Sequence, residues 1–492
     1  MCSLVCLVGA ASPVFGVELD SLELEAPGRL RAVLPGDFDG DGRNDLGVAY
    51  LTGQTPLTER KIGVFWQNED GSYTFGTDSV FDIPDSVALL DSSAIGFTRD
   101  RILLLDYEGI DAVFFENRAP TPLARLVDVE SVVFHGESDD VTHFELDPPL
   151  FDGNQLFVPQ WGKLAVLECD GSGMWSQAQV RIPQQAYYLA GPLRHSFRIS
   201  DQSLQVALTT PLYEGGDVDG DGRKDLLVHR DENLFVYLRR SDGGFDEWPT
   251  AAAHFPLRSD EEKENDSARL SMVLGDIDGD GVIDVAANKL SGGMRAMQGA
   301  TSVFLGIGDG SFTEKPVWSL EDSGYASSLS LVDADSEPGK ELIIPNAKIG
   351  LFELSRIALS GSISLEIRTF KAGRGMDDEA ESSFDFDVLL DYSGGAQLLS
   401  PDPLYEDFDG DGLDDLLLSR GDALFELYRG TKSGFDMSAP IASVSAPVSR
   451  SLRALPGASG VGSVAVIFYP FDEKRTHTLR VIRSKAKGDR LP

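Results

Sequence analysis

The sequence predicts an all-β chain folded as a β-propeller of four-stranded blades. Three observations support this prediction: turn residues are frequent, an acidic loop motif recurs along the chain, and a short apolar strand recurs behind each loop. The chain has 51 Gly and 25 Pro among its 492 residues, and many of them separate short apolar runs, as is typical of strands joined by turns. Single cores stop growing at about 250–300 residues, so several domains or one repeat architecture is expected.

The composition excludes disorder and narrows the choice of partners. Hydrophobic residues make up 42% of the chain and include 27 Phe, 12 Tyr and 5 Trp, which is enough apolar material for a large core. The net charge is −38, from 42 Lys and Arg against 80 Asp and Glu. This charge repels phosphates and anionic lipids, so binding to nucleic acids or membrane surfaces through basic patches is not expected. Cations are the natural partners of such a chain.

The first segment has the features of a signal peptide. Residues 1–16 are uncharged and apolar, and they are too few to span a bilayer as a helix. Small residues at Val14 and Gly16 fit cleavage after Gly16, which predicts a secreted, periplasmic or cell-surface protein; a buried first strand is the alternative. No later run is long enough for a transmembrane helix. Two of the three cysteines fall in this segment, which leaves Cys169 alone and predicts no disulfide within the mature chain.

Four segments carry nearly the same acidic loop, with acids at positions 1, 3, 5 and 9 and glycine at position 6. The acids are Asp37, Asp39, Asp41 and Asp45; Asp217, Asp219, Asp221 and Asp225; Asp276, Asp278, Asp280 and Asp284; and Asp407, Asp409, Asp411 and Asp415. A fifth, irregular segment has acids at the same offsets, at Asp333, Asp335, Glu337 and Glu341. Several such copies in one chain indicate an internal repeat.

The spacing of these acids suits a hard cation such as Ca²⁺. Calcium takes about 6–8 oxygen ligands at 2.3–2.6 Å, and alternate acids of a short loop can point inward toward one ion. Glycine at position 6 permits the sharp turn that returns the end of the loop to the ion. Position 7 varies, as expected if only its carbonyl binds, and holds Arg43, Arg223, Val282 or Leu413. The sequence predicts four calcium sites, with the irregular loop as a candidate fifth; an acidic turn without metal is the alternative.

The residues after each loop exclude an EF-hand. An EF-hand needs a bidentate Glu at position 12 and then a helix, whereas position 12 here is Val48, Val228, Ala287 or Leu418. Positions 10–12 are apolar in all four loops, and a short apolar run bounded by turns indicates a buried strand. Each loop is therefore predicted to be the turn of a β-hairpin.

A recurring third strand sets the length and number of the repeats. It begins at Ile62, Leu234, Ser302 and Leu424, and four more copies begin at Ala112, Leu164, Leu351 and Thr478. Units of about 60 residues with four strands fit propeller blades, so eight blades are predicted, with seven as the alternative. The last unit has only three strands, and residues 17–26 can supply the fourth and close the ring. The predicted propeller spans residues 17–486, followed by a basic tail at 487–492.

The acidic hairpins, each followed by an apolar strand and a Gly-x-aromatic or Ser-Gly-Phe turn, resemble the FG-GAP/VCBS repeats of the integrin α-chain head and of many bacterial secreted proteins. The resemblance covers nearly the whole chain after residue 16 and is strong in the four units with full loops. It implies structural calcium on one face of the ring, with partners on the other face or the rim.

These features predict a calcium-binding module for adhesion to a protein or glycan. A carbohydrate-active enzyme, similar to propeller polysaccharide lyases, is the alternative. No catalytic residue is predicted, because no Gly-x-Ser-x-Gly, His-Glu-x-x-His or phosphate-binding glycine motif occurs. His135 and His143 lack metal-ligand spacing and are interpreted as part of a solvated loop. His195, with Arg194 and Arg198, is interpreted as part of an insert on the rim.

The tryptophans are interpreted as packing between blades, because large aromatic residues more often fill cores than ligand surfaces. Stacking on sugars is the alternative role. The five residues are Trp66, Trp161, Trp175, Trp248 and Trp318.

Overall fold

The computed structural model describes most of the chain from Val17 to Ala486. The described residues are 17–54, 57–133, 141–147, 155–170, 173–192, 202–292, 297–323, 325–326, 329–335, 337–347, 359–371, 373, 375–391, 397–398, 402–431, 434–455, 462–470 and 472–486. The predicted signal peptide, residues 1–16, and the predicted basic tail, residues 487–492, lie outside them.

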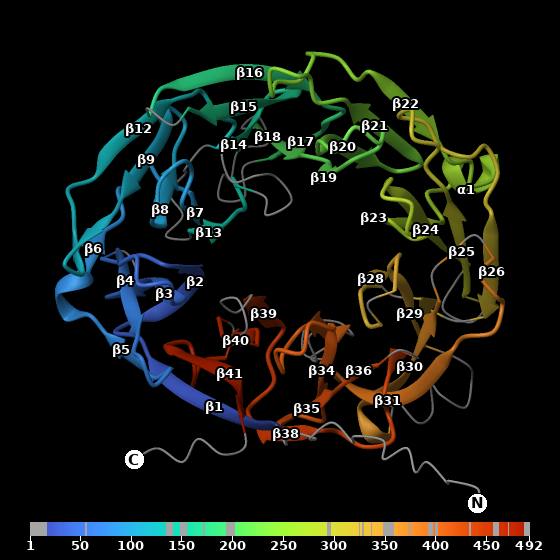
Figure 1. Ribbon diagram of the computed structural model, residues 1–492. Coiled ribbons are helices and arrows are strands. Elements are labelled where there is room, and N and C mark those ends of the chain that lie inside the picture. Colours follow the sequence, from blue (N-terminus) through green and yellow to red (C-terminus); the bar gives the residue numbers. More distant parts are fainter. Residues whose placement is uncertain are drawn as a thin grey trace, which may run out of the picture.

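Eight antiparallel sheets form a ring, and each sheet is one blade whose first strand faces the centre (Figure 1). The prediction of a propeller with eight blades is confirmed, and the alternative of seven is wrong. From the centre outward, the first four blades contain β2 (Arg29–Gly36), β3 (Asp45–Thr52), β4 (Glu59–Gln67), β5 (Tyr73–Phe75) and β6 (Phe81–Asp82); β7 (Leu89–Ser93), β8 (Arg101–Leu105), β9 (Gly109–Val113) and β12 (Ala124–Asp128); β14 (Gln155–Gln160), β15 (Lys163–Cys169) and β16 (Trp175–Arg181); and β19 (Leu212–Gly216), β20 (Asp225–Arg230), β21 (Asn233–Tyr237) and β22 (Ala251–His254).

The other four blades have the same order of strands. They contain β23 (Arg269–Gly275), β24 (Asp284–Ser291), β25 (Gln298–Phe304) and β26 (Trp318–Ser323); β28 (Ser330–Val332), β29 (Glu341–Ala347), β30 (Ser362–Phe370) and β31 (Ser382–Asp391), with β27 (Tyr325–Ala326) and β32 (Gln397–Leu398) at its edges; β33 (Leu404–Glu406), β34 (Asp415–Arg420), β35 (Leu424–Tyr428) and β38 (Ala442–Ser445); and β39 (Ser451–Leu455), β40 (Val464–Phe468) and β41 (Thr478–Ala486) with β1 (Val17–Glu25).

Small elements lie between the blades. They are the pairs β10 (Phe115–Glu116) with β11 (Ala119–Pro120), β17 (Gln185–Pro192) with β18 (Gln202–Thr209), and β36 (Gly430–Thr431) with β37 (Gly434–Phe435), the short strand β13 (Thr142–His143), the 3-10 turn η1 (Thr77–Ser79) and the helix α1 (Asp260–Glu264). The predicted insert before the fourth blade is therefore the hairpin β17–β18. None of the helices in the described residues is long and apolar enough to cross a membrane.

The predicted third strand of the sixth blade requires a correction. The segment that begins at Leu351 lies outside the described residues, and the third strand of this sheet is β30, which pairs with β29 and β31. Buried apolar residues alternate with partly exposed residues along β30, as expected for a strand between two neighbours. The buried residues include Ile363, Leu365 and Ile367.

Six of the other predicted copies lie on the third strands of their blades. The copy at Leu164 lies on β15, the middle strand of the three-stranded third sheet. In that blade β14 takes the place of a second strand, because its Phe157 N–H donates to the carbonyl of Leu146 and its side chains pack against both neighbouring blades.

The core of the protein lies between the blades. Eight clusters of buried apolar residues occur among the described residues, and each combines side chains from two adjacent blades. The second strand of each blade serves two clusters at once. In β20, Leu226 and Val228 pack against the third blade, whereas Leu227 packs against the fifth. Side chains that alternate between two buried faces explain why the second strands are apolar without interruption.

The ring closes through the N-terminal strand, as predicted. All nine residues of β1 pair with β41, in a register from Val17 opposite Ala486 to Glu25 opposite Thr478. Leu19 packs into the cluster between the seventh and eighth blades, and Leu22 packs against the cluster between the eighth and first. The first and last described strands, β1 and β41, are thus neighbours in one sheet (Figure 1).

Removal of residues 17–27 should lower the melting temperature and cause self-association. The deletion removes the partner of β41 along its whole length, and an unpaired strand edge recruits other chains. The measurement compares the melting temperature and the molar mass in solution of a chain that starts at Gly28 with those of a chain that starts at Val17. Deletion of residues 487–492 is the control and should change neither quantity. An equally stable monomer after the first deletion would contradict closure through β1.

Candidate metal centres

The four full acidic loops occupy equivalent places in the ring. Each joins the first and second strands of its blade, in the first, fourth, fifth and seventh blades. Equivalent turns of a propeller lie at the same end of the ring. In each loop, the acids at positions 1, 3 and 9 place one carboxylate oxygen each within 4.8 Å of one another. These three-acid clusters are Asp37, Asp39 and Asp45; Asp217, Asp219 and Asp225; Asp276, Asp278 and Asp284; and Asp407, Asp409 and Asp415.

The carboxylate at position 1 organises the turn. In the first blade, Asp37 accepts hydrogen bonds from the backbone N–H groups of Gly40 and Gly42, at 2.7 and 2.9 Å. Both glycines have positive φ, +80° and +83°, which a residue with a side chain rarely adopts. The equivalent bonds in the other three loops are 2.6 to 2.9 Å long. The glycines therefore wrap the loop around one carboxylate.

The carboxylate at position 9 is buried and ties the loop to the sheet. Asp45 accepts hydrogen bonds from the N–H of Phe38, at 3.2 Å, and from the N–H of Gln67 at the end of β4, at 2.8 Å. Burial, together with the charges of Asp39 and Asp41, raises the pKa of Asp45 to about 7. The pKa values of the equivalent acids are raised for the same main reason, to about 6 for Asp225 and Asp284 and to about 7 for Asp415.

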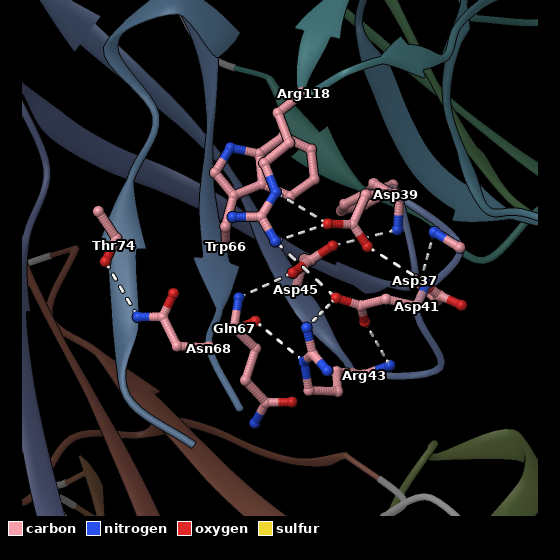
Figure 2. Close-up of polar contacts among 12 residues, drawn as sticks. Asp37, Asp39, Asp41, Arg43, Asp45, Trp66, Gln67, Asn68, Thr74 and Arg118 are labelled. Atoms are coloured by element: carbon pink, nitrogen blue, oxygen red, sulfur yellow. Dashed lines mark hydrogen bonds and ion pairs between the residues drawn. The ribbon is translucent and has the colours of Figure 1, made fainter. Parts of the chain in front are cut away.

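Positions 5 and 7 are placed differently from positions 1, 3 and 9. Asp41 lies outside the three-acid cluster and pairs with the side chain of Arg43, as Asp221 does with Arg223 (Figure 2). The backbone N–H at position 7 donates to the carboxylate at position 5 in every full loop, at 2.8 to 3.0 Å. This bond involves Arg43, Arg223, Val282 and Leu413, with Asp41, Asp221, Asp280 and Asp411 as acceptors.

Two arginines that the sequence analysis missed reach the clusters. Arg118 extends from the second blade to Asp39, with Nε 2.8 Å from the carboxylate, and its guanidinium lies 5.1 Å from the ring centre of Trp66 (Figure 2). Arg429 places its Nε 2.9 Å from the carboxylate of Asp409. Arg118 is 79 residues from its partner, so no local pattern could have indicated the contact.

The irregular fifth loop keeps only part of this arrangement. Glu341 is buried at position 9, accepts the N–H of Ala334 at 2.9 Å, and has a pKa that burial raises to about 7. Asp335 faces Lys371, whose Nζ lies 3.9 Å from its carboxylate. Among the described residues, Asp333, Asp335, Glu337 and Glu341 do not bring three carboxylates together as the full loops do.

The acidic loops also join neighbouring blades. The carbonyl of Asp37 accepts the N–H of Asp100 from the second blade at 3.0 Å, and the carbonyl of Asp407 accepts the N–H of Ser463 from the eighth blade at 2.7 Å. Equivalent bonds of 2.9 Å run to Asp217 from Ile283, to Asp276 from Lys340, and to Asp333 from Asp414. The first residue of each of these loops thus links its blade to the next.

The carboxylate clusters fit a calcium ion by size and chemistry. Two oxygens on opposite sides of an ion with bonds of 2.3–2.6 Å are about 5 Å apart, so three oxygens within 4.8 Å of one another are close enough to bind one such ion. Carboxylate oxygens are the ligands that hard divalent cations prefer. Three converging carboxylates repel one another unless a cation or protons neutralise them.

Comparison with known proteins agrees with the fold and the loops. A model of the FG-GAP-like repeat matches residues 217–287, which begin with the first acid of the fourth blade and include the acidic loop of the fifth. The chain is a β-propeller with an FG-GAP-like repeat. This agrees with the predicted resemblance to the FG-GAP/VCBS repeat family. No curated protein matches the chain.

Solved structures similar to this chain are distant. A lectin of Agrocybe aegerita that recognises non-reducing terminal N-acetylglucosamine is 14% identical, with a TM-score of 0.37 over 86% of this chain and 81% of the lectin. Sqt1 of Chaetomium thermophilum is 13% identical, with a TM-score of 0.43 over 94% and 97%. The Nup133 β-propeller domain of Vanderwaltozyma polyspora is 11% identical, with a TM-score of 0.34 over 88% and 100%. Similarity at this level carries no information on function.

The interpretation of His143 as part of a solvated loop is wrong. His143 belongs to the short strand β13, which pairs in parallel with the edge of β7. The His143 ring lies 3.3 Å from a carboxylate oxygen of Asp91 and 3.2 Å from the guanidinium of Arg453 in the eighth blade. His135 and His195 lie outside the described residues, as do Arg194 and Arg198.

The tryptophans divide into packed and exposed residues. Trp66 and Trp318 are buried between blades, as predicted, and Trp175 packs partly against the cluster between the second and third blades. Trp161 and Trp248 are exposed, so the prediction of blade packing is wrong for them.

Without metal, the free energy of unfolding should fall as the pH rises from about 4 to about 7. The acids at position 9 have a folded-state pKa near 6 or 7 and a usual value of 3.8, so folding takes up protons in this range. The cost of ionising these buried acids lowers the free energy of unfolding. This cost is absent below pH 4, grows between pH 4 and pH 7, and is constant above pH 7. Urea unfolding of the chelator-treated protein at pH 5 and pH 7 measures the effect. Asp45→Asn should reduce the slope, and a metal-free stability that rises toward pH 7 would contradict the prediction.

Proposed function

We propose that the chain is a calcium-stabilised propeller that acts as a secreted, periplasmic or cell-surface binding module for a protein or glycan. The observation that carries the proposal is the recurrence of one three-acid cluster at the same place in four blades. A propeller with an FG-GAP-like repeat is consistent with a binding module. Residues 1–16 support export through their signal-peptide character.

Electrostatics support calcium as the occupant of the clusters. The acids at position 9 are buried, and the chain carries a net charge of −38, so neutral pH leaves a large repulsion to be offset. The acids at positions 1, 3 and 9 would hold the ion, and further oxygens would come from position 5, the position-7 carbonyl or water. Calcium is favoured over Mg²⁺, because Mg²⁺ requires near-ideal octahedral geometry at about 2.0–2.1 Å and keeps its waters.

The proposed role of calcium is structural. Bound calcium would neutralise a loop whose first residue also links its blade to the next, as the bond from Ser463 to Asp407 illustrates. The ion would therefore stabilise the interface between blades as well as the hairpin. The opposite end of the ring and the rim remain for a ligand. The alternative of a carbohydrate-active enzyme would be favoured by turnover of an acidic polysaccharide.

Calcium should bind to the native protein with about four ions per chain, one for each three-acid cluster. Chelation should lower the melting temperature, since a ligand that binds only the folded state stabilises it. Native mass spectrometry counts the ions, and thermal unfolding with EDTA, Ca²⁺ or Mg²⁺ measures the stabilisation. Magnesium should restore less of the melting temperature than calcium. Absence of bound calcium together with a melting temperature insensitive to EDTA would refute the calcium proposal.

Substitutions of Asp219 should rank by the number of ligand oxygens that they remove. Asp219→Ala removes the ligand and should cost about 3 kcal/mol of calcium-dependent stability when calcium is roughly 100 times the Kd. Asp219→Asn keeps one oxygen and should cost less. Glu314→Ala is the matched control, because Glu314 is an exposed acid outside the clusters. Urea unfolding with and without calcium measures the costs; equal, negligible costs for both Asp219 variants would mean that this loop binds no ion.

A further inference from the structure

A pocket of about 740 Å³ lies between the second and third blades, and nothing described so far uses it. Its walls are the turn between β8 and β9, the turn between β14 and β15, the chain that follows β12, and the outer strand β16. Turns between second and third strands lie at the opposite end of the ring from the acidic loops, because successive antiparallel strands turn at alternate ends. The volume is within the range of small-molecule sites, about 300–1,000 Å³.

Two exposed aromatic side chains line this pocket. Trp161 is 58% exposed and Tyr107 is 41% exposed. Trp161 stands at the tip of a two-residue turn, because Gln160 and Lys163 pair directly in the hairpin. The hydroxyl of Tyr107 donates to the carboxylate of Glu130 at 2.6 Å, which holds the tyrosine in place. The pocket therefore presents two large rings on supports that the sheets position.

Trp161 and Trp248 are both exposed, but a side chain covers the ring of Trp248 alone among the contacts of the described residues. Trp248 is 63% exposed, but the guanidinium of Arg181 lies 4.8 Å from its ring centre and covers one face. In the part of the chain that the structure describes, no aromatic ring or guanidinium is stacked on Trp161. As far as the described residues go, its ring faces are open to a ligand, whereas the ring of Trp248 already has a partner.

A buried amide in the pocket wall lacks an acceptor partner. Gln160 is only 7% exposed, and its Nε2 donates to the carbonyl of Glu130 at 2.6 Å. Its Oε1 is buried and has no hydrogen-bond partner among the described residues. Buried acceptors are normally paired, because an unpaired one loses its hydrogen bond to water without replacement. Because this oxygen has almost no exposed surface, a donor group of a ligand would reach it only after a small movement of the pocket wall.

The remaining lining groups are acceptors and donors suited to hydroxyl groups. Glu108, Asp128 and Glu130 supply carboxylates, while Gln177 and Gln179 supply amides. Lys163 Nζ donates to Gln179 Oε1 at 2.8 Å, which leaves the amide nitrogen of Gln179 to donate elsewhere. The lining includes three carboxylates and one lysine, and Arg125 outside it lies 3.8 Å from the carboxylate of Asp128. The acids still outnumber these cations, in a chain of charge −38, so the pocket disfavours anionic ligands.

We propose that this pocket binds a neutral saccharide. The C–H face of a sugar ring packs against an aromatic ring such as Trp161, and its hydroxyls pair with carboxylates and amides. A uronate or sulfated sugar would be repelled by the lining acids. The inference rests on the proposed function as a binding module and deepens it by naming the site and the class of ligand.

The test uses a panel of neutral disaccharides: cellobiose, lactose, maltose and N,N′-diacetylchitobiose. Saturation-transfer NMR and tryptophan fluorescence titration should detect at least one of them binding to the whole chain. Trp161→Ala should weaken that binding by about tenfold or more, since it removes the stacking surface, and Trp161→Phe should recover part of it. Trp248→Ala is the matched control and should bind as the parent does. The melting temperature of Trp161→Ala should match the parent, because the side chain stands at an exposed turn.

Several outcomes would overturn the proposal. The first is that no disaccharide binds up to about 10 mM. The second is that Trp161→Ala and Trp248→Ala weaken disaccharide binding equally. The third is that the Trp161 site binds tetralysine or trigalacturonate better than the neutral disaccharides. Failure here is separable from failure of the proposed function. A protein or glycan ligand found on arrays and insensitive to Trp161→Ala would leave the binding module standing and refute this pocket. Calcium binding and chelator sensitivity are measured without any sugar.

Discussion

Each blade has two apolar faces that only its neighbours can cover, and the rest of the structure depends on this constraint. Leu226 and Leu227 are adjacent in β20, yet they pack against different neighbouring blades. A blade at the end of an open row would leave one such face in water, at a cost proportional to its apolar area. The chain avoids this cost only by closing the ring, and β1 completes the sheet in which the last three strands lie.

The acidic loops act on the same interfaces between blades. Their first residues accept hydrogen bonds from the next blade. The buried acid at position 9 of each full loop accepts a backbone N–H from the last residue of the third strand of its own blade or from one of the two residues after that strand. Burial of a carboxylate disfavours its charged form, which is why these acids have raised pKa values. A bound cation would neutralise these buried carboxylates and so stabilise the interfaces between blades. Arg118 already supplies one such positive charge to Asp39 from the neighbouring blade.

The two ends of the ring carry different chemistry. One end has converging carboxylates held by backbone hydrogen bonds, an arrangement suited to a small hard cation. The other end has the pocket with Trp161 and Tyr107, where aromatic faces and hydrogen-bonding groups are combined. Because the strands that connect the two ends are buried on both faces, the ring is a rigid support, and a site on it is held in fixed geometry.

Local patterns in the amino-acid sequence were enough to predict several features. The acids and glycines of each loop and the apolar second strand that follows lie within a few residues of one another, so they could be predicted. Their recurrence along the chain indicated the repeat length, and a last unit with one strand too few indicated closure by residues 17–26. Only the folded structure shows how the loop acids divide, since positions 1, 3 and 9 converge whereas Asp41 lies beside Arg43, and the alternate spacing does not distinguish them. It also brings together residues distant in the chain, such as Arg118 and Asp39. It bound His143 to Asp91 and Arg453, and it exposed Trp161 while burying Trp66. Such contacts follow from how blades meet around the ring, and spacing along one strand carries no information about the neighbouring blade.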